Sequence, residues 1–452
     1  MKRVLHNVLC IWACSLLVFT LAAQAQNAHS DEGGISSKLV NLINQHYDYL
    51  ERLYKYLHTH PELSFHELNT SKRIATELKN LGFEVTTHVG GNGIVGVFKN
   101  GQGPTVLVRT DLDALPVKEQ TGLPYASQVR VKDDQGNEVN VMHACGHDMH
   151  MTVFVGTATL LTQLKKEWHG TLVMIGQPAE EKGGGAKAMI ADGLFERFPR
   201  PDYALALHVN ASMPAGTVGY REGYALANVD AVDILIRGAG GHGAYPQATK
   251  DPIVLAAETV MALQTIVSRE IPPIEPAVVT VGSIHGGTKH NIIPDEVKLQ
   301  LTLRSYSDKV RNHTIEAIRR ITKGLAIAAG VPEDRMPIVT VGDEYTPATY
   351  NDPELTRRVA KVIGQVLGEK NVIRTEPVMG GEDFGRYGRV EPKIPICIFW
   401  LGAVDPQKVA ESRKTGKPLP SLHSSLFAPL PEPTIKTGVK AMTAAVLELM
   451  SK

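Results

Sequence analysis

Runs of apolar residues alternate with amphipathic segments along most of the chain. Short β-rich runs occur at residues 105–108, in "GTLVMIGQ", in "DYALALH" and in "CIFWLGA". Apolar residues at helical spacing predict helices over residues 36–57, 70–81, 149–166 and 184–192. Strands that alternate with helices predict an α/β fold with a mostly parallel sheet and helices on both of its faces.

Polar side chains follow the predicted strands at the points where the strands end. Those that can bind a metal are Asp111 and Asp113, Glu180 and Glu181, His208 and, after a long loop, His423. In open α/β sheets, ligands bind in the crevice beyond the carboxyl ends of the strands. The pattern therefore predicts that these side chains gather at one edge of the sheet.

A middle segment interrupts the alternation of strands and helices. It predicts strands at 229–237, 278–284, 296–305 and 337–341, and helices at 252–269 and 308–329. This βαββαβ order is the split pattern of an antiparallel sheet with two helices on one face. We therefore expect a first α/β domain built from residues 26–225 and 338–452, with an inserted antiparallel-sheet domain at 226–337.

Composition and charge exclude some classes of protein. The chain has 452 residues, of which 43% are hydrophobic, and its 47 basic and 47 acidic residues are interspersed. These values are typical of a globular protein with two domains. They give no basic surface that would predict nucleic-acid binding.

The first 25 residues have the features of a secretory signal. Lys2 and Arg3 precede an apolar run from Val8 to Ala23, and "AQA" supplies small residues for a signal peptidase. The run is shorter than the about 20 apolar residues that a membrane-spanning helix needs. We expect an exported protein, periplasmic or secreted, with no stable membrane association after cleavage.

The segment "MHACGHDMH" at residues 142–150 concentrates metal-binding chemistry. It follows a polar loop and leads into the predicted helix near Met149, for which Asp148 is a candidate N-cap. Cys145 and His147 therefore lie on a turn at the ligand-binding edge, and Gly146 permits a tight backbone there.

Two other roles for Cys145 are open at this point. In an exported protein, Cys145 and Cys397 form an even pair that would first be interpreted as a disulfide. Cys397, however, lies in "IPICIFW", where a cysteine is most simply a small core residue. A thiolate nucleophile activated by His143 or His147 is also chemically reasonable. It leaves Glu180, Glu181, His208 and His423 without a role.

A metal centre uses these side chains together, although each alone has an ordinary explanation. A single strand-end histidine is usually a core residue, and a single "EE" is usually a solvated turn. Zinc favours thiolate, imidazole and carboxylate ligands, and manganese is compatible with the carboxylates. Five candidate ligands suffice for two divalent ions if one of them bridges: Cys145, His147, Glu181, His208 and His423. Glu180, beside a ligand, is then placed for general acid/base chemistry.

A series of motifs resembles the dimetal aminoacylase/carboxypeptidase family. The resemblance is greatest to its branch of hippurate hydrolases, N-acyl-amino-acid amidohydrolases and auxin-conjugate hydrolases. The motifs span roughly residues 47–427 and occur in the order "YLHTHPELSFHE", "VRTDLDALPV", "MHACGHDMH", "PAEE", "LHV", "GGHGAYP", "KHNIIPDEV", "GGEDF" and "LHSS".

The resemblance implies a role for each matching residue. It implies that Cys145 bridges two metal ions and that Glu180 is the general base. It implies that His147, Glu181, His208 and His423 complete the ligand set. His242 matches a histidine of the inserted domain that stabilises the oxyanion, commonly from the partner subunit, and Asn291 matches an asparagine that contacts substrate. Asp111 stands where other branches carry a ligand histidine, and Asp113 follows it where those branches carry an aspartate, so support of the ligands is expected of both.

The function that the resemblance implies is hydrolysis of an N-acyl or N-aroyl amino acid, or of a short peptide, by a homodimer formed through the inserted domain. A carboxypeptidase or dipeptidase on the same scaffold is the alternative within enzymes. A binding protein that retained the fold is a third hypothesis, and the complete set of candidate ligands and Glu180 argue against it.

Overall fold

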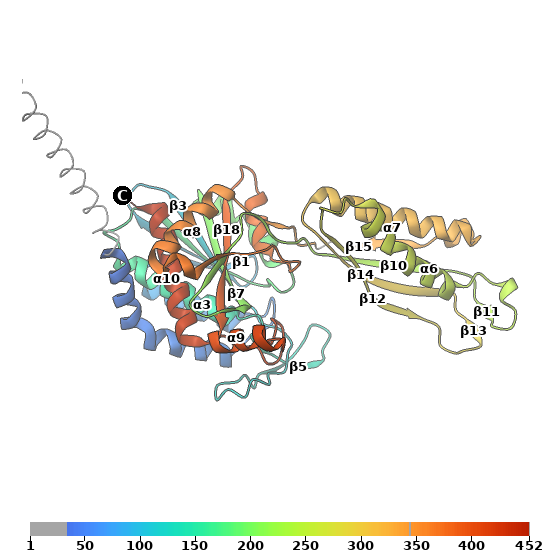
Figure 1. The fold of residues 1–452 in the computed structure, drawn as a ribbon, viewed down its shortest axis with the longest axis horizontal. Coiled ribbons are helices and arrows are strands. Elements are labelled where there is room, and N and C mark those ends of the chain that lie inside the picture. The colour runs from blue at the N-terminus through green and yellow to red at the C-terminus, as the bar shows by residue number, and fades with distance from the viewer. Residues whose placement is uncertain (1–33, 343–344, 452) are drawn as a thin grey trace, which may run out of the picture.

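A computed structural model describes residues 34–342 and 345–451. The predicted signal segment, residues 1–25, lies outside the described residues. The described chain forms a large domain and a smaller one (Figure 1). None of the helices in the described ranges combines the length and the apolar character needed to cross a membrane.

The large domain contains a sheet whose strand order is β1-β2-β6-β3-β7-β18-β8-β17. The strands are β1 (Glu84–Val89), β2 (Gly93–Asn100), β3 (Thr105–Asp111), β6 (Gly170–Gln177), β7 (Tyr203–Pro214), β8 (Val218–Tyr220), β17 (Val372–Arg374) and β18 (Ile396–Val404). The adjacent central strands β6, β3, β7 and β18 are parallel. Antiparallel pairing occurs outside them, at β2 with β6 and at β18 with β8. The predicted α/β class is confirmed, and the carboxyl ends of the four central strands meet at one edge.

Helices cover both faces of this sheet because its strands are apolar on both sides. One core cluster includes Val106, Leu205 and Phe399, and packs against the helix over residues 34–59 and further helices. These further helices are α2 (Leu68–Asn80), α3 (His147–Gln163), α8 (Pro353–Leu367) and α10 (Pro431–Met450). The alternate strand residues, including Leu107 and Ile398, face the second cluster with α4 (Gly185–Ala191) and α5 (Leu194–Arg197). The strand residues divide between the two clusters because successive side chains of a strand point to opposite faces of the sheet.

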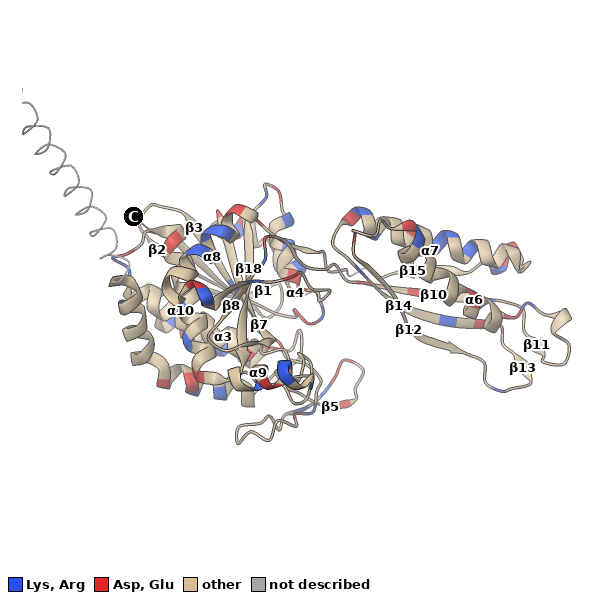
Figure 2. Cartoon of the chain, viewed as in Figure 1, with Lys and Arg blue, Asp and Glu red and all other residues tan. Residues whose placement is uncertain are grey.

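The smaller domain has the predicted βαββαβ order and an antiparallel sheet, β12-β14-β10-β15. Its elements are β10 (Asp230–Arg237), α6 (Pro252–Thr265), β12 (Ala277–Gly286), β14 (Glu296–Ser305), α7 (Asp308–Ala328) and β15 (Ile338–Val341). Both helices lie on one face of the sheet (Figure 1) and share a separate core with it. Lysine, arginine and acidic residues are mixed on α7 and over both domains (Figure 2).

Three local predictions need correction. Strand β15 pairs with β10, so the smaller domain extends past the predicted boundary at residue 337. Strand β7 does not end at His208 but continues to Pro214, because β18 pairs with it beyond the last residue paired to β3. Helix α3 begins at His147 with Gly146 as its N-cap, at φ 80°, so Asp148 is not the cap. Its carboxylate instead accepts a hydrogen bond from His58.

Short two-stranded sheets complete the fold. They are β4 (Arg130–Lys132) with β5 (Glu138–Asn140), β9 (Gly223–Leu226) with β16 (Thr349–Asn351), and β11 (Gly241–His242) with β13 (Ile292–Ile293). The two-stranded sheet β11–β13 lies at the end of the smaller domain that is farthest from the large sheet (Figure 1). Helix α9 (Pro406–Thr415) follows β18 and precedes the segment that carries His423.

Candidate metal centre

The predicted ligands come together beyond the ends of the central strands. Cys145 precedes α3, and His147 is the first residue of that helix. Glu181 follows β6, and His208 lies within β7. His423 reaches the same place from the loop after α9, where its backbone N–H donates to the carbonyl of Ala144 at 2.9 Å.

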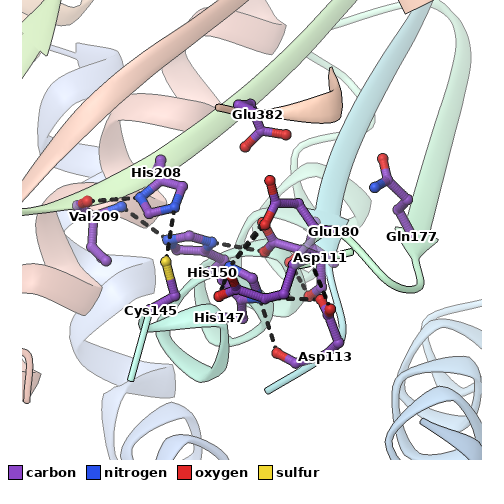
Figure 3. A network of polar contacts seen from close by, with 12 residues as sticks. Asp111, Asp113, Cys145, His147, His150, Gln177, Glu180, His208, Val209 and Glu382 are labelled. Atoms are coloured by element: carbon purple, nitrogen blue, oxygen red, sulfur yellow. Dashed lines mark hydrogen bonds and ion pairs between the residues drawn. The ribbon is translucent and has the colours of Figure 1, made fainter. Parts of the chain in front are cut away.

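Two groups of donor atoms share the thiol of Cys145. One group is Cys145, His147 and His208, and the other is Cys145, Glu181 and His423; within each, the donor atoms lie within 4.8 Å of one another. The Sγ atom is 3.5 Å from Nε2 of His208 and 3.3 Å from Nε2 of His423. Ligands bound at about 2.0–2.3 Å to one tetrahedral ion are about 3.3–3.8 Å apart. The spacing fits two metal positions that share Cys145. Figure 3 shows Cys145 with His147 and His208, the residues of the first group.

The chemistry of these side chains also fits a bound cation. Nε2 of His147 and Oε1 of Glu181 are buried and have no hydrogen-bond partner among the described residues. Burial, with the neighbouring carboxylate of Glu181, raises the pKa of the Cys145 thiol well above its usual range. Burial also raises the pKa of Glu181 to about 7. Buried acidic groups that repel one another are stabilised in their ionised forms by a metal ion.

The pKa of Cys145 and the free state of both cysteines bear on the two other roles considered for Cys145. A cysteine nucleophile requires a lowered pKa, which burial of this thiol opposes. Cys145 and Cys397 are both free and buried. Cys397 belongs to the core that faces α3 and α10, which confirms it as a core residue.

A tight turn presents Glu180 and Glu181 to the centre. The carbonyl of Ala179 accepts hydrogen bonds from the N–H groups of Gly184 and Gly185, each at 3.2 Å. A Cβ atom on Gly185 would lie 1.6 Å from the carbonyl oxygen of Pro178, so this position requires glycine. Thus "KGGGA" folds the chain back directly after the two glutamates.

Glu180 lies beside the ligands. One of its carboxylate oxygens is 3.9 Å from Nε2 of His147. Burial raises the pKa of Glu180 well above its usual range, and the carboxylates of Glu382 and Glu181 raise it further. A carboxylate with a raised pKa beside a metal centre is suited to accept and return a proton.

Asp111, at the end of β3, and Asp113, just after it, support the histidines and the turn. Asp113 accepts hydrogen bonds from the hydroxyl of Ser64 at 2.6 Å and from the backbone N–H of Glu181 at 3.0 Å. Its backbone carbonyl is 2.9 Å from Nδ1 of His147. Asp111 lies 2.7 Å from Nδ1 of His150, whose Nε2 accepts the N–H of Val209. Such contacts fix the orientation of metal-binding side chains.

A buried ionic cluster of four side chains adjoins the centre. Arg109 donates to Asp111 at 2.8 Å, to Glu382 at 2.9 Å and to Asp383 at 3.2 Å. All four side chains are buried. Removal of one partner from such a cluster leaves an unpaired buried charge and costs about 3–5 kcal/mol. The cluster joins β3 to the "GGEDF" segment.

A cavity of about 780 Å³ opens onto the candidate ligands. Its lining includes Cys145, Glu180, Glu181, His208 and His423. The smaller domain and its connections contribute Val229, Ala231, Arg304 and Thr346 to the same cavity. The centre therefore lies at the junction of the two domains.

Two predicted site residues are not brought to the centre within one chain. His242, in β11, and Asn291, directly before β13, are exposed at the far end of the smaller domain (Figure 1). They lie close to each other, since the carbonyl of Asn291 accepts the N–H of Gly243 at 2.9 Å. Nδ1 of His242 accepts the N–H of Ala244 at 3.0 Å, so a neutral ring carries its proton on Nε2.

Several residues near the centre were not among the sequence-based candidates. His150 had a detectable signal, because it follows His147 by one helical turn in "GHDMH". His58 and Glu67 lie within the motif "YLHTHPELSFHE", but that motif by itself assigned no role to either of them, and Arg304 lies outside every motif. Their proximity to the centre depends on how distant segments pack.

The fold and the centre define a metal-dependent hydrolase that acts on amide bonds. Residues 107–416 match the family model described as peptidase family M20/M25/M40. The chain belongs to this family, and the resemblance noted from the motifs is confirmed.

Relatives within the family carry several names. The chain is 36% identical to thermostable carboxypeptidase 1 of Saccharolobus solfataricus over 419 residues, 92% of this chain and 99% of that protein. It is 39% identical to the hippurate hydrolase of Campylobacter jejuni over 340 residues, 74% of this chain and 84% of that protein. A crystal structure of the Bacillus subtilis YXEP protein, a dinuclear metal binding peptidase, is 28% identical with a TM-score of 0.71, covering 90% and 100% of the two chains.

Proposed function

We propose that this chain is an exported hydrolase of N-acyl or N-aroyl amino acids, such as hippurate. It releases a carboxylic acid and a free amino acid. The observation that carries this proposal is that one cavity joins the candidate metal ligands, a cationic side chain and an apolar wall. These are the features needed for the amide, the carboxylate and the acyl group of such a substrate.

The cationic side chain is Arg304, at the end of β14. It lines the cavity, and no described residue forms a hydrogen bond or ion pair with its guanidinium group. Burial lowers its pKa from the ordinary value. A guanidinium group without a partner is suited to bind a carboxylate through two parallel hydrogen bonds. We assign to it the free carboxylate of the amino-acid portion.

The apolar wall comes from both domains. It includes Leu226, Val229, Val378, Trp400 and Leu422. The ring of Trp400 lies edge-on to that of His208, with the ring centroids 5.7 Å apart. An aromatic or branched acyl group would bury apolar surface here, at about 25 cal/mol per Å².

We propose that two divalent ions occupy the centre, zinc being favoured by the thiolate and imidazole ligands and manganese remaining compatible. When bound, such ions polarise a carbonyl group and lower the pKa of water. Glu180 takes the proton from the attacking water and returns it to the departing amine. His147, Glu181, His208, His423 and Cys145 hold the ions.

The remaining parts of the proposal concern the assembly and the compartment. Nε2–H of His242 is a donor suited to the developing oxyanion, and the backbone contact between Asn291 and Gly243 places Asn291 beside it. We propose that both reach the centre of the partner subunit in a homodimer formed through the smaller domain. Export rests on the predicted signal segment.

A carboxypeptidase or dipeptidase is the second candidate, favoured by the name of the Saccharolobus solfataricus relative. Both reactions cleave an amide next to a residue with a free carboxylate. They differ in whether an acyl group or an aminoacyl group, with its charged amine, occupies the apolar part of the cavity.

The test is a substrate comparison on metal-reconstituted enzyme. We expect kcat/KM for N-benzoylglycine to exceed that for glycylglycine and that for the primary amide of N-benzoylglycine, which lacks the carboxylate. Substitution Arg304→Leu should raise KM for N-benzoylglycine about 10- to 100-fold, the loss expected for a charged hydrogen-bonding partner. A higher kcat/KM for the dipeptide would favour the peptidase. Fractionation with N-terminal sequencing of the mature protein tests export.

A further inference from the structure

A buried carboxylate joins two residues of unusual backbone conformation next to the metal centre. Among the described residues other than glycine, positive φ angles occur at Phe65, His88, Ala179 and His423. Ala179 directly precedes Glu180 and has φ 49°, and Phe65 has φ 67°. For an L-residue with a Cβ atom, this left-handed region is unfavourable, so other contacts must hold the chain there.

The contacts that hold both residues converge on Glu67. Its Oε1 accepts the backbone N–H of Phe65 at 2.7 Å and that of Ala179 at 2.8 Å. Its Oε2 lies 3.3 Å from the side-chain nitrogen of Asn92. Glu67 is buried completely. Burial and the carboxylate of Asp113 raise the pKa of Glu67 to about 7, while the hydrogen bonds from these backbone N–H groups oppose that rise by stabilising the ionised form.

The side chain of Glu67 does not stabilise the helix that it precedes. Glu67 is the N-cap residue of α2, yet its side chain makes no capping hydrogen bond. The first turn of α2 is instead satisfied by Glu62, which accepts the N–H groups of Asn69 and Thr70. The carboxylate of Glu67 is therefore directed away from α2, toward the turn that carries Glu180.

The conformation of Ala179 determines the direction of the two glutamates. Its N–H is bound by Glu67, and its carbonyl by Gly184 and Gly185. Both hydrogen-bonding groups of this residue are thus fixed immediately before Glu180. A change in φ at Ala179 would change the direction of the residues that follow it in the turn, including Glu180 and Glu181.

We propose that Glu67 is a positioning residue, which holds Ala179 in the left-handed conformation and so directs Glu180 and Glu181 to the metal centre. This inference rests on the proposed roles of Glu180 and Glu181. Glu67 itself does not contact the candidate ligands.

The test compares Glu67→Gln, Ala179→Gly and the double variant, with Glu62→Gln as the matched control. Glutamine retains the size of Glu67 but loses its charge and presents an amide nitrogen to one of the donors. A misplacement of about 1 Å at a catalytic group can cost about 100-fold in rate. We therefore expect Glu67→Gln to lower kcat about 10- to 100-fold with little change in KM, and to bind less metal per chain. Glu62→Gln should lower the melting temperature and leave kcat unchanged.

Glycine adopts positive φ without steric cost. Ala179→Gly alone should therefore keep kcat close to that of the unmodified chain. In the double variant, it should recover part of the kcat and of the bound metal lost in Glu67→Gln. If Glu67→Gln does not fold, the double variant is expected to fold and to hold metal.

Wild-type kcat and metal content in Glu67→Gln would overturn the inference. So would a double variant that recovers neither kcat nor metal, because Glu67 would then act through something other than Ala179. Failure of the proposed function gives a different result: Glu180→Gln would retain activity. Glu180→Gln that is inactive, together with an unaffected Glu67→Gln, contradicts the positioning role alone.

Discussion

The thiol of Cys145 lies 3.3 Å from Nε2 of His423, although 278 residues separate the two in the sequence. The loop after α9 brings His423 to the N-terminal end of α3, where its N–H donates to the carbonyl of Ala144. His423 has φ 66°, a conformation that a non-glycine residue rarely adopts. Such strain is commonly retained at functional sites.

This relationship predicts that bound metal protects Cys145 from thiol reagents. Iodoacetamide should label Cys145 in the native protein after chelation and label it much more slowly when metal is present. Cys397, which is fully buried in the core, should react in neither state until the protein is denatured. Mass spectrometry of the labelled peptides measures both sites. Equal labelling of Cys145 with and without metal would contradict its role as a ligand.

Glu180 and Glu181 should fail in different ways when their charge is removed. We expect Glu180→Gln to retain bound metal and to lose about 100- to 10,000-fold in kcat, the contribution of a positioned base. Glu181→Gln should lose metal as well as activity, because its carboxylate belongs to a donor group with Cys145 and His423. Metal analysis of the two purified variants, beside their kcat values, checks the division of roles. Equal metal loss in both would contradict it.

His242 should act on the centre of the other subunit. His242→Ala is expected to retain metal and fold but to lose about 100- to 1,000-fold in kcat, as when an oxyanion donor is removed. His285→Ala, which removes another exposed histidine of the smaller domain, is the control and should keep its activity.

Mixing His242→Ala with Glu180→Gln tests donation between subunits. A mixed dimer then contains one centre with both residues intact, so some activity should return after subunit exchange. If each centre used the His242 of its own chain, no mixed dimer would be active. Absence of recovery, with exchange confirmed by mass spectrometry of labelled subunits, would exclude donation from the partner.

Because His58 is expected to be charged in the fold, the protein should lose stability as the pH becomes alkaline. Burial by itself lowers the pKa of His58, but its hydrogen bonds to Asp148 at 2.6 Å and Glu119 at 3.1 Å raise it to about 10. A histidine whose pKa is higher in the folded protein than in the unfolded chain stabilises the fold fully at pH values below its pKa in the unfolded chain, about 6.5. This stabilisation is lost as the pH rises through the folded-state pKa of about 10. Each unit of pKa corresponds to about 1.4 kcal/mol.

Denaturant unfolding between pH 6 and pH 10.5 measures this effect. We expect the free energy of unfolding to fall by several kcal/mol more in the unmodified chain than in His58→Gln, when both are compared in the same metal state. Parallel pH dependences of the two proteins would show that His58 is not charged in the fold.

The sequence by itself determined the elements of the fold and their class. Strands and helices follow from the periodicity of apolar residues, which is a local property, and the βαββαβ order of the smaller domain was readable for this reason. Parallel strand ends meet at one edge as a consequence of topology. That rule also located His208 and Glu181 near each other without knowledge of any contact.

Tertiary structure decided which polar groups meet and which are satisfied. Aspartate is a residue type common at N-caps, but packing of the helix over residues 34–59 places His58 where it donates a hydrogen bond to the carboxylate of Asp148. Arg304 enters the cavity because β14 of the smaller domain ends there, and no local pattern distinguishes it from a surface arginine. The left-handed conformation of Ala179 is held by Glu67, which is 112 residues away. Hydrogen bonds and burial of this kind arise between distant segments, so they become defined when the chain packs.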